Sequence, residues 1–331
     1  MRFFIFMLKK CTINKKECTM TNIIFCINIV LPIFLLMGIG FFLRKKIIND
    51  EFLTVADRLS FRLFMPCILF YNIYKADLNV AFSWKLIGYV VAAVSVATLL
   101  SFILTRFTVK DRAKRGVAIQ GMMRSNSVLF AIPICQALYD GDASMVSIVL
   151  AFYAPLINVF SVIALSLYSR NKQKITPIKI IKDILTNPFV IASVLGICCN
   201  ICSIHFITII EKTISDVAKM ATPFALIVLG ANFTFTSLKK NASLLSLVTA
   251  MKVLVYPFFI LLIAKYLGFR GMEFSVILAT FCAPVAVNSY VMAKMMDCDE
   301  DFASQIIVTT TFVSMFSLML YLYLAKIFAL L

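Results

Sequence analysis

Charged side chains are scarce in this chain. Asp, Glu, Lys and Arg supply only 15% of its 331 residues, whereas hydrophobic residues supply 62%. An ordinary soluble domain is about 25% charged, so this chain lacks the polar surface that water requires. The charges fall in short bursts between apolar runs of roughly 18–25 residues, the length that crosses about 30 Å of hydrocarbon as a helix. Because the runs do not alternate polar and apolar residues, they exclude a β-barrel and indicate an all-α polytopic membrane protein.

Histidine is nearly absent, since His205 is the single one. This excludes the zinc proteases with an H-E-x-x-H motif, and the chain also has no G-x-S-x-G, Walker or G-x-G-x-x-G motif. Cys199, Cys202 and His205 are spaced so that they could share one side of a helix end, as metal ligands do. A C-x-x-C pair inside an apolar run is, however, more typical of thiols that act as small hydrophobic groups. We therefore expect no enzyme activity, no cofactor and no metal.

The basic excess, a formal net charge of +16, lies in the connections between the apolar runs. Nucleic acid is excluded as a partner because no soluble basic domain is present to bind it. Loops rich in Lys and Arg are typical of the cytoplasmic side, beside anionic lipid. Fifteen cations fall on one side and six on the other. This predicts a multi-pass plasma-membrane protein with both termini outside the cytoplasm.

Residues 1–19 disagree with that orientation, because they add five cations to the outer side. We interpret them as a dispensable extension, or as upstream of a translation start at Met20. The rest of the chain contains ten candidate spans. They are 22–43, 52–74, 83–106, 115–139, 143–169, 184–204, 213–236, 242–267, 272–296 and 302–329.

The long basic connection at 170–183 divides the spans into two sets of five, residues 20–169 and 184–331. Spans two and seven carry similar segments, RLFMPCILF and KMATPFALI, each with a cation four residues before a proline. Since five is odd, the second set must cross the membrane upside down relative to the first. The sequence therefore predicts two inverted five-helix repeats joined by a cytoplasmic linker, an arrangement common in secondary transporters.

Spans four and nine, which correspond in the two repeats, are interrupted by polar residues and proline. A break is tolerable in hydrocarbon only where protein, water or a ligand satisfies the freed backbone groups. Paired breaks of this kind indicate a transporter binding site, although a single proline is more often a packing kink. The candidate residues at the two breaks are Ser125, Asn126, Ser127 and Pro133 in span four, and Pro284, Asn288 and Ser289 in span nine.

Two cations complete the candidate site. Arg124 adjoins the break in span four, and Lys252 lies about ten residues into span eight. Neither broken span carries a carboxylate in its middle, so Na⁺ coupling is disfavoured, while proton coupling and facilitated diffusion both stay open. Uncompensated positive charge and the positive ends of half-helices favour an anion, which we expect to be a small organic carboxylate. A structural alternative for Lys252 is a bond to a backbone carbonyl or snorkelling.

Five segments together resemble the auxin efflux carrier family of bacterial and plant transporters. They are SNSVLFAIPICQALYDG, the span-nine segment APVAVNSYVMAKMMDCDEDFASQIIVTTTFVS, LPIFLLMGIGFFLRKK, ILTNPFVIASVLGI and ATPFALIVLGANF. The resemblance covers residues 20–331. Ala131 stands where the family usually has glycine, and Asp140 is inserted before Gly141. The plant carriers have a second proline at the position of Ser289, so a gentler break is expected here and auxin itself is a less favoured substrate.

The resemblance implies ten helices in inverted repeats, with spans four and nine unwound and crossing in the middle of the membrane. It also implies a scaffold and a mobile transport domain, and organic anions such as malate, malonate or auxin as substrates. By position, Asn126 matches the asparagine near the crossing, Pro133 and Pro284 match the prolines, and Asn288 with Ser289 matches the polar region that follows. Relatives suggest a homodimer.

We therefore predict a secondary carrier that moves small organic anions by alternating access. Ser125, Asn126 and Ser127 would orient the carboxylate, and Arg124 or Lys252 would supply positive charge. An anion channel or a membrane sensor on the same scaffold is the alternative, and saturable counterflow would separate carrier from channel.

Overall fold

The computed structural model describes residues 31–75, 83–139, 144–170, 177–232 and 236–331. Within these ranges the chain is helical and forms no strand. The first helix is Leu31–Arg44. It is followed by α2 (Asp50–Leu59), η1 (Ser60–Phe64), α3 (Met65–Tyr74), α4 (Trp84–Thr108), α5 (Arg112–Met123), α6 (Ser127–Leu138), α7 (Ser144–Tyr168), α8 (Pro177–Thr186), α9 (Pro188–Ile201), α10 (Thr208–Asn232), α11 (Thr236–Ala250), η2 (Met251–Val255), α12 (Tyr256–Tyr266), α13 (Gly271–Phe281), α14 (Asn288–Met295) and α15 (Glu300–Ile327). The predicted extension at 1–19 lies outside the described residues.

Five helices of the described chain are long and apolar enough to cross a membrane. They are Trp84–Thr108, Met145–Tyr168, Thr208–Asn232, Asn241–Tyr266 and Glu300–Ile327. Leu31–Arg44, Pro188–Ile201 and Gly271–Phe281 are apolar but shorter. The prediction of an all-helical, polytopic membrane protein is thereby confirmed, whereas length and composition do not establish ten spans or an inverted repeat.

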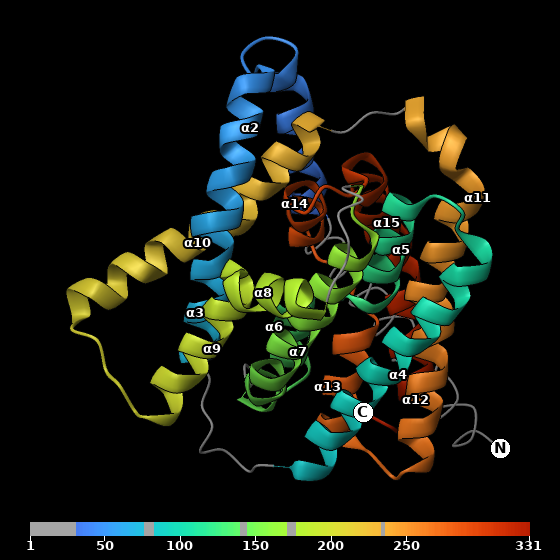
Figure 1. Cartoon of the computed structure of the whole chain (residues 1–331). Coiled ribbons are helices and arrows are strands. Elements are labelled where there is room, and N and C mark those ends of the chain that lie inside the picture. The colour runs from blue at the N-terminus through green and yellow to red at the C-terminus, as the bar shows by residue number, and fades with distance from the viewer. Residues whose placement is uncertain (1–30, 76–82, 140–143, 171–176, 233–235) are drawn as a thin grey trace, which may run out of the picture.

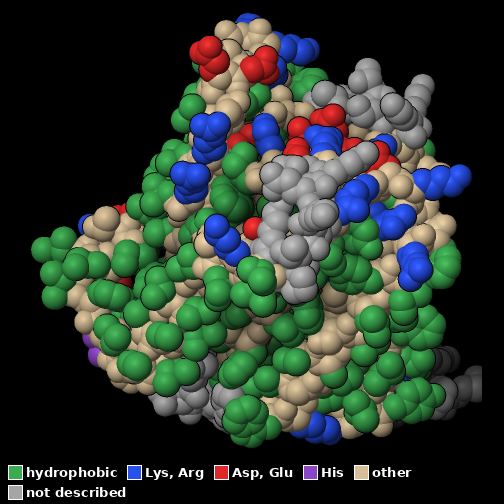
Figure 2. Space-filling model, viewed as in Figure 1, with side chains coloured by type: hydrophobic (Ala, Val, Ile, Leu, Met, Phe, Trp, Pro, Cys, Tyr) green, Lys and Arg blue, Asp and Glu red, His purple; other side chains and the backbone are tan. Residues whose placement is uncertain are grey.

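Charge is distributed unevenly over the surface. Figure 2 shows hydrophobic side chains over most of the middle and lower part of the view, while Lys and Arg gather towards the upper end, where α2 begins. Arg44, Lys110, Arg112 and Arg170 belong to connections or helix starts that the sequence assigns to one side. An apolar belt with a cationic end is the surface expected of a protein that faces lipid and anionic headgroups.

Two helices contain a π-helical turn that ends two residues before a proline. η1 precedes Pro66, which has no N–H to donate to the carbonyl of Arg62, and η2 precedes Pro257 in the same relation to Val253. Proline removes the regular backbone hydrogen bond at that position, and single π turns are frequent at functional sites. The second π turn contains Lys252, whose side chain is only 2% exposed.

The helices pack as two groups that lie side by side in Figure 1. In the first group, α3 packs against α9 and α10, and α2 packs against α10. In the second group, α5 contacts α4, α7, α11, α14 and α15, while α13 contacts α6, α7 and α12. Fewer contacts join the groups, chiefly those of α7 with α3 and α9 and those of α14 with η1 and α2. The boundary between the groups therefore has fewer contacts than either group has within itself.

Two glycines let the Leu31–Arg44 helix pack closely against α10. A Cβ on Gly230 of α10 would overlap the carbonyl of Met37, and one on Gly40 would overlap the carbonyl of Ile227. Small residues that let helix backbones approach are typical of helix pairs in membranes. Because Gly40 and Gly230 have no side chain, the backbones of the Leu31–Arg44 helix and α10 can lie in direct contact.

The segment 170–183, predicted as a linker, is partly helical. α8 begins at Pro177 and runs through Thr186, then Asn187 caps the start of α9 with its side chain, which accepts from the N–H of Phe189 at 3.0 Å. Ile178, Ile181 and Leu185 of α8 are exposed and share one face at helical spacing. An amphipathic helix with an exposed apolar face fits a position in the membrane interface. The second half of the predicted linker is therefore a helix that can lie on the membrane.

Candidate functional site

Both helices expected to be interrupted are interrupted. α5 ends at Met123 and α6 begins at Ser127, while α13 ends at Phe281 and α14 begins at Asn288. The two breaks meet, because the backbone N–H of Asn126 donates to the carbonyl of Pro284 at 2.7 Å. The N–H of Val285 donates to Thr310 Oγ1 at 3.2 Å. Backbone groups freed by one break are thus satisfied by the other break and by α15, as burial requires.

The prolines occupy different positions relative to the breaks. Pro284 lies inside the interruption of span nine, whereas Pro133 lies in the middle of α6, beyond the interruption of span four. The Ser-Asn-Ser triplet, and not Pro133, is therefore the place where span four unwinds. Neither proline lines the cavity described below.

Arg124 is the C-cap of α5 and is 2% exposed. Its Nη2 donates to Asn158 Oδ1 at 2.7 Å, its Nη1 to Ser161 Oγ at 2.8 Å, and its Nε to Asn288 Oδ1 at 3.1 Å. A cation at a helix C-terminus is favoured by the helix dipole. The three acceptors are neutral, however, so the guanidinium charge itself has no carboxylate partner among the described ion pairs.

Lys252 contacts the break in span four from outside the cavity. Its Nζ donates to Ser125 Oγ, while the N–H of Ser125 donates to the hydroxyl of Tyr153 at 3.1 Å. Lys252 does not line the cavity. Its ammonium therefore supplies positive charge next to the break and holds the Ser125 hydroxyl, instead of facing a ligand directly.

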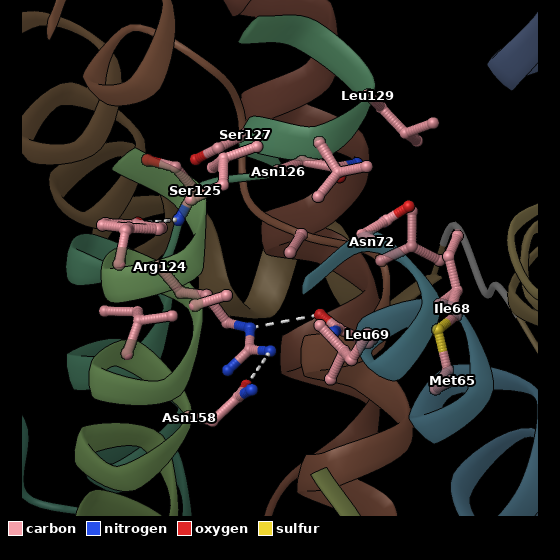
Figure 3. A pocket seen from close by; sticks show the side chains of 18 of the residues that line it. Met65, Ile68, Leu69, Asn72, Arg124, Ser125, Asn126, Ser127, Leu129 and Asn158 are labelled. Carbon is pink, nitrogen blue, oxygen red and sulfur yellow. Dashed lines mark hydrogen bonds between the residues drawn. The ribbon is translucent and has the colours of Figure 1, made fainter. Parts of the chain in front are cut away.

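A small cavity lies beside the breaks, at the boundary of the two helix groups (Figure 3). Its volume is about 70 Å³. The second group contributes Arg124, Ser125, Asn126, Ser127, Val128, Leu129, Leu150, Tyr153, Ala154, Ile157, Asn158, Ala286, Val287 and Asn288, and the first group contributes Met65, Ile68, Leu69, Asn72 and Thr222. No Asp or Glu is among these lining residues.

Two amides of the cavity have unused hydrogen-bonding capacity. Asn126 makes no side-chain hydrogen bond to the α6 backbone that it caps, and the buried Nδ2 of Asn72 has no partner among the described residues. The first turn of α6, which includes Val128 and Leu129, also faces the cavity. The N–H groups of a first turn have no partner within their helix, so a guanidinium, two amides and a positive helix end all favour an anion here.

The structure places the expected site residues in two sets. Arg124, Ser125, Asn126, Ser127 and Asn288 surround the cavity, while Lys252, Pro133, Pro284 and Ser289 lie outside its lining. The hydroxyl of Ser289 is buried without a described partner. Within the described residues, no three or more His, Cys, Asp or Glu side chains are grouped so that they could hold a metal ion.

Sequence reasoning missed Asn72, Tyr153, Asn158 and Ser161. Asn72 is an amide in the apolar run CILFYNIY of span two, and Asn158 and Ser161 are spaced by three in span five. Buried polar side chains within a membrane helix usually face the bundle interior. That signal could have identified Asn72 and Asn158, but polar residues in otherwise apolar spans are numerous in this chain, and nothing in the sequence says which ones meet.

Comparison with known proteins agrees with this architecture. A family profile described as "Membrane transport protein" matches residues 25–177 and 169–322. The chain is 24% identical over 296 residues to an uncharacterized transporter of Methanothermobacter thermautotrophicus, covering 88% of this chain and 96% of that protein. It is 22% identical over 302 residues to an uncharacterized transporter of Methanocaldococcus jannaschii, covering 86% and 94%. These matches confirm the resemblance that the sequence motifs carried.

Proposed function

The chain belongs to the membrane transport protein family, and from this we propose that it is a secondary carrier for small organic anions, with carboxylates as the substrate class. We further propose that it works by alternating access in the plasma membrane. In this arrangement, ten spans form two inverted repeats, and both termini lie outside the cytoplasm.

The observation that carries the proposal is the position of Arg124. Its guanidinium lines a cavity without carboxylates, between two helix groups, and its described acceptors are neutral. Charged groups inside a membrane protein usually mark substrate or ion pathways. Arg binds carboxylates through two parallel N–H bonds, so a carboxylate is the ligand that would compensate this charge.

The cavity is too small for the proposed substrate. Ligand pockets usually measure about 300–1,000 Å³, whereas this cavity measures about 70 Å³. A malate-sized anion therefore requires the wall formed by α3 and α10 to move away from the breaks. That movement is the alternating-access step, and it occurs at the boundary where the two groups share fewest contacts.

A thermal-shift screen of the purified protein against C3–C6 mono- and dicarboxylates tests the substrate class. The Asn126→Ala variant should lose the stabilisation by the best ligand, because its amide lines the cavity. Asn232→Ala is the matched control, since Asn232 Nδ2 donates to the carbonyl of Val228 in its own helix at 3.0 Å and should keep the shift. If both variants respond like wild type, the ligand does not bind at the breaks.

Flux measurements in proteoliposomes separate a carrier from the alternatives. A carrier shows saturable uptake that is accelerated by substrate on the opposite side, whereas an anion channel shows no counterflow. A membrane sensor would bind the anion without moving it. Binding without flux would therefore overturn the transport proposal while keeping the site.

A further inference from the structure

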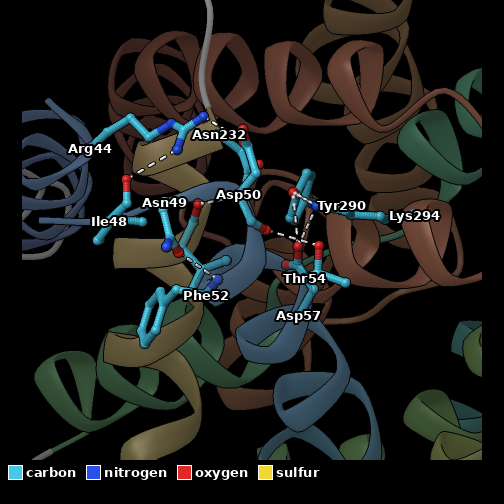
Figure 4. A network of polar contacts seen from close by, with 11 residues as sticks. Arg44, Ile48, Asn49, Asp50, Phe52, Thr54, Asp57, Asn232, Tyr290 and Lys294 are labelled. Atoms are coloured by element: carbon cyan, nitrogen blue, oxygen red, sulfur yellow. Dashed lines mark hydrogen bonds and ion pairs between the residues drawn. The ribbon is translucent and has the colours of Figure 1, made fainter.

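Asp57 is the one carboxylate among the described residues that is buried. It lies on α2, is 0% exposed, and its Oδ2 accepts from Lys294 Nζ at 2.5 Å and from the hydroxyl of Tyr290 at 3.5 Å. Its second oxygen, Oδ1, has no donor among the described residues. Figure 4 shows Lys294 and Tyr290 of α14 meeting Asp57 of α2. The proposed anion site does not use any of the three.

This contact joins the two helix groups. Of the ion pairs that the described residues form, only Asp57–Lys294 connects a helix of the first group with a helix of the second. α14 also begins at Asn288, which accepts from Arg124 in the cavity. One short helix therefore contacts the anion site at its start and α2 near its end.

The carboxylate depends on a single cation. The charged side chains on its own helix and on neighbouring elements are otherwise directed elsewhere or exposed. Arg44 pairs with Asp50, Lys219 pairs with Asp216, Arg58 and Arg62 are exposed, and Glu300 at the start of α15 adds a repulsive negative charge. Losing Lys294 would leave Asp57 ionised, buried and unpaired, a state that costs more than neutralising the group with a proton.

We infer that Asp57 is a proton-binding site, at which a proton and the ammonium of Lys294 compete for one carboxylate. Proton binding releases α14 from α2, and proton loss restores the contact. The Lys294 side chain is 22% exposed, so water reaches the pair from the lysine side. In each event one proton passes between water and Asp57 while Lys294 stays protonated. A role in coupling rests on the proposed carrier function, whereas the proton site itself does not.

Infrared spectroscopy tests the proton site without any substrate. Lys294→Met removes the competing ammonium, so at neutral pH this variant should show a carboxylic acid C=O band that wild type lacks. The double variant D57N/K294M should lose that band, which assigns it to Asp57. A K294M spectrum without the band would overturn the inference, and K294Q serves in its place should K294M not fold.

Hydrogen exchange tests the release of α14. Asp57→Asn mimics the protonated carboxyl, so it should raise exchange across Asn288–Met295 by about the amount that acidification produces in wild type, after correction for the intrinsic pH dependence of exchange. Asp50→Asn is the matched control, because it breaks the exposed Arg44–Asp50 pair on the same helix. Unchanged α14 protection in D57N, or equal changes in D50N, would count against the competition.

Transport connects the site to coupling. Uptake of radiolabelled malate into proteoliposomes should be increased by an imposed pH gradient in wild type. In D57N the gradient should have no effect, while malate counterflow persists. If D57N keeps the gradient response, Asp57 is not the coupling site. If wild type does not move malate at all, the carrier proposal fails for this probe, and the infrared and exchange results still decide the proton site.

Discussion

Replacing Arg124 by lysine separates charge from geometry at the candidate anion site. A guanidinium has five N–H donors, and three of them bind Asn158, Ser161 and Asn288. Two remain, the number that a carboxylate accepts side by side. A lysine has three donors and no fixed fork. R124K therefore keeps the positive charge but, if it satisfies the same three acceptors, has none left for the substrate.

The expected magnitude follows from the two lost bonds. A hydrogen bond to a charged group contributes about 1.5–3 kcal/mol, so at the lower value the variant loses about 3 kcal/mol of binding free energy. Since about 1.4 kcal/mol corresponds to a tenfold change in Kd, the best carboxylate of the screen should bind R124K about 100-fold more weakly. Isothermal titration in detergent or nanodiscs measures this directly.

The matched control is Arg115→Lys. Arg115 lies on the same helix and donates through Nε and Nη2 to the carbonyl of Val109, at 2.9 and 2.6 Å, outside the cavity. R115K should bind the carboxylate like wild type. If R124K also binds within about threefold of wild type, which corresponds to under 1 kcal/mol, Arg124 only caps α5 and the substrate lies elsewhere.

Three further predictions concern residues that do not line the cavity. Gly230→Ala should lower the free energy of unfolding by about 1–3 kcal/mol, because its Cβ would overlap the backbone of Met37. Gly38→Ala is the control in a thermal unfolding experiment and should leave the stability unchanged, since its Cβ meets nothing within 4 Å. Lys252→Met should lower the transport rate more than the affinity for the anion, because the ammonium donates to Ser125 and does not line the cavity. The transport rate is measured in proteoliposomes and the affinity by titration of the purified protein. Burial raises the pKa of the Cys298 thiol to about 12, so it stays uncharged at neutral pH and should resist maleimide under native conditions, while exposed Cys202 is labelled.

The sequence was sufficient for the architecture around the breaks. The apolar runs predicted where helices lie, and the polar interruptions of spans four and nine predicted where α5 and α13 end. These signals are local, since an apolar run and its polar interruption are both read from neighbouring residues in the sequence. The number of spans and their inversion are not local properties, so they stay predictions here.

The partners of the buried charges could not be predicted in the same way. Arg124 and Asn126 were identified because they adjoin a break, but Asn158 joins them from α7 through tertiary packing. Lys294 and its carboxylate partner Asp57 are separated by 237 residues in the sequence. Contacts of such sequence separation depend on how the helix groups pack, which neither composition nor periodicity encodes.

The distribution of polar groups would keep the free-energy cost low if the two helix groups move relative to each other as proposed. Arg124 and its acceptors Asn158, Ser161 and Asn288 all belong to the second helix group, so the positive centre would travel as one unit with its hydrogen bonds intact. The facing wall from the first group is mostly apolar, with Met65, Ile68 and Leu69. Sliding along these three apolar side chains would break none of the Arg124 hydrogen bonds. Each buried polar group left unsatisfied would otherwise cost about 1–3 kcal/mol.

Few polar contacts then have to break when the groups separate. Among the described ones, Asn158 Nδ2 donates to Ser193 Oγ of α9 at 3.3 Å, and Lys294 and Tyr290 of α14 contact Asp57 of α2. The first is long and neutral, so the ion pair is the stronger of the two restraints. If the proposed carrier opens at this boundary, its main polar barrier lies at Asp57, and under the proposed competition with Lys294 a proton at that carboxylate removes the barrier.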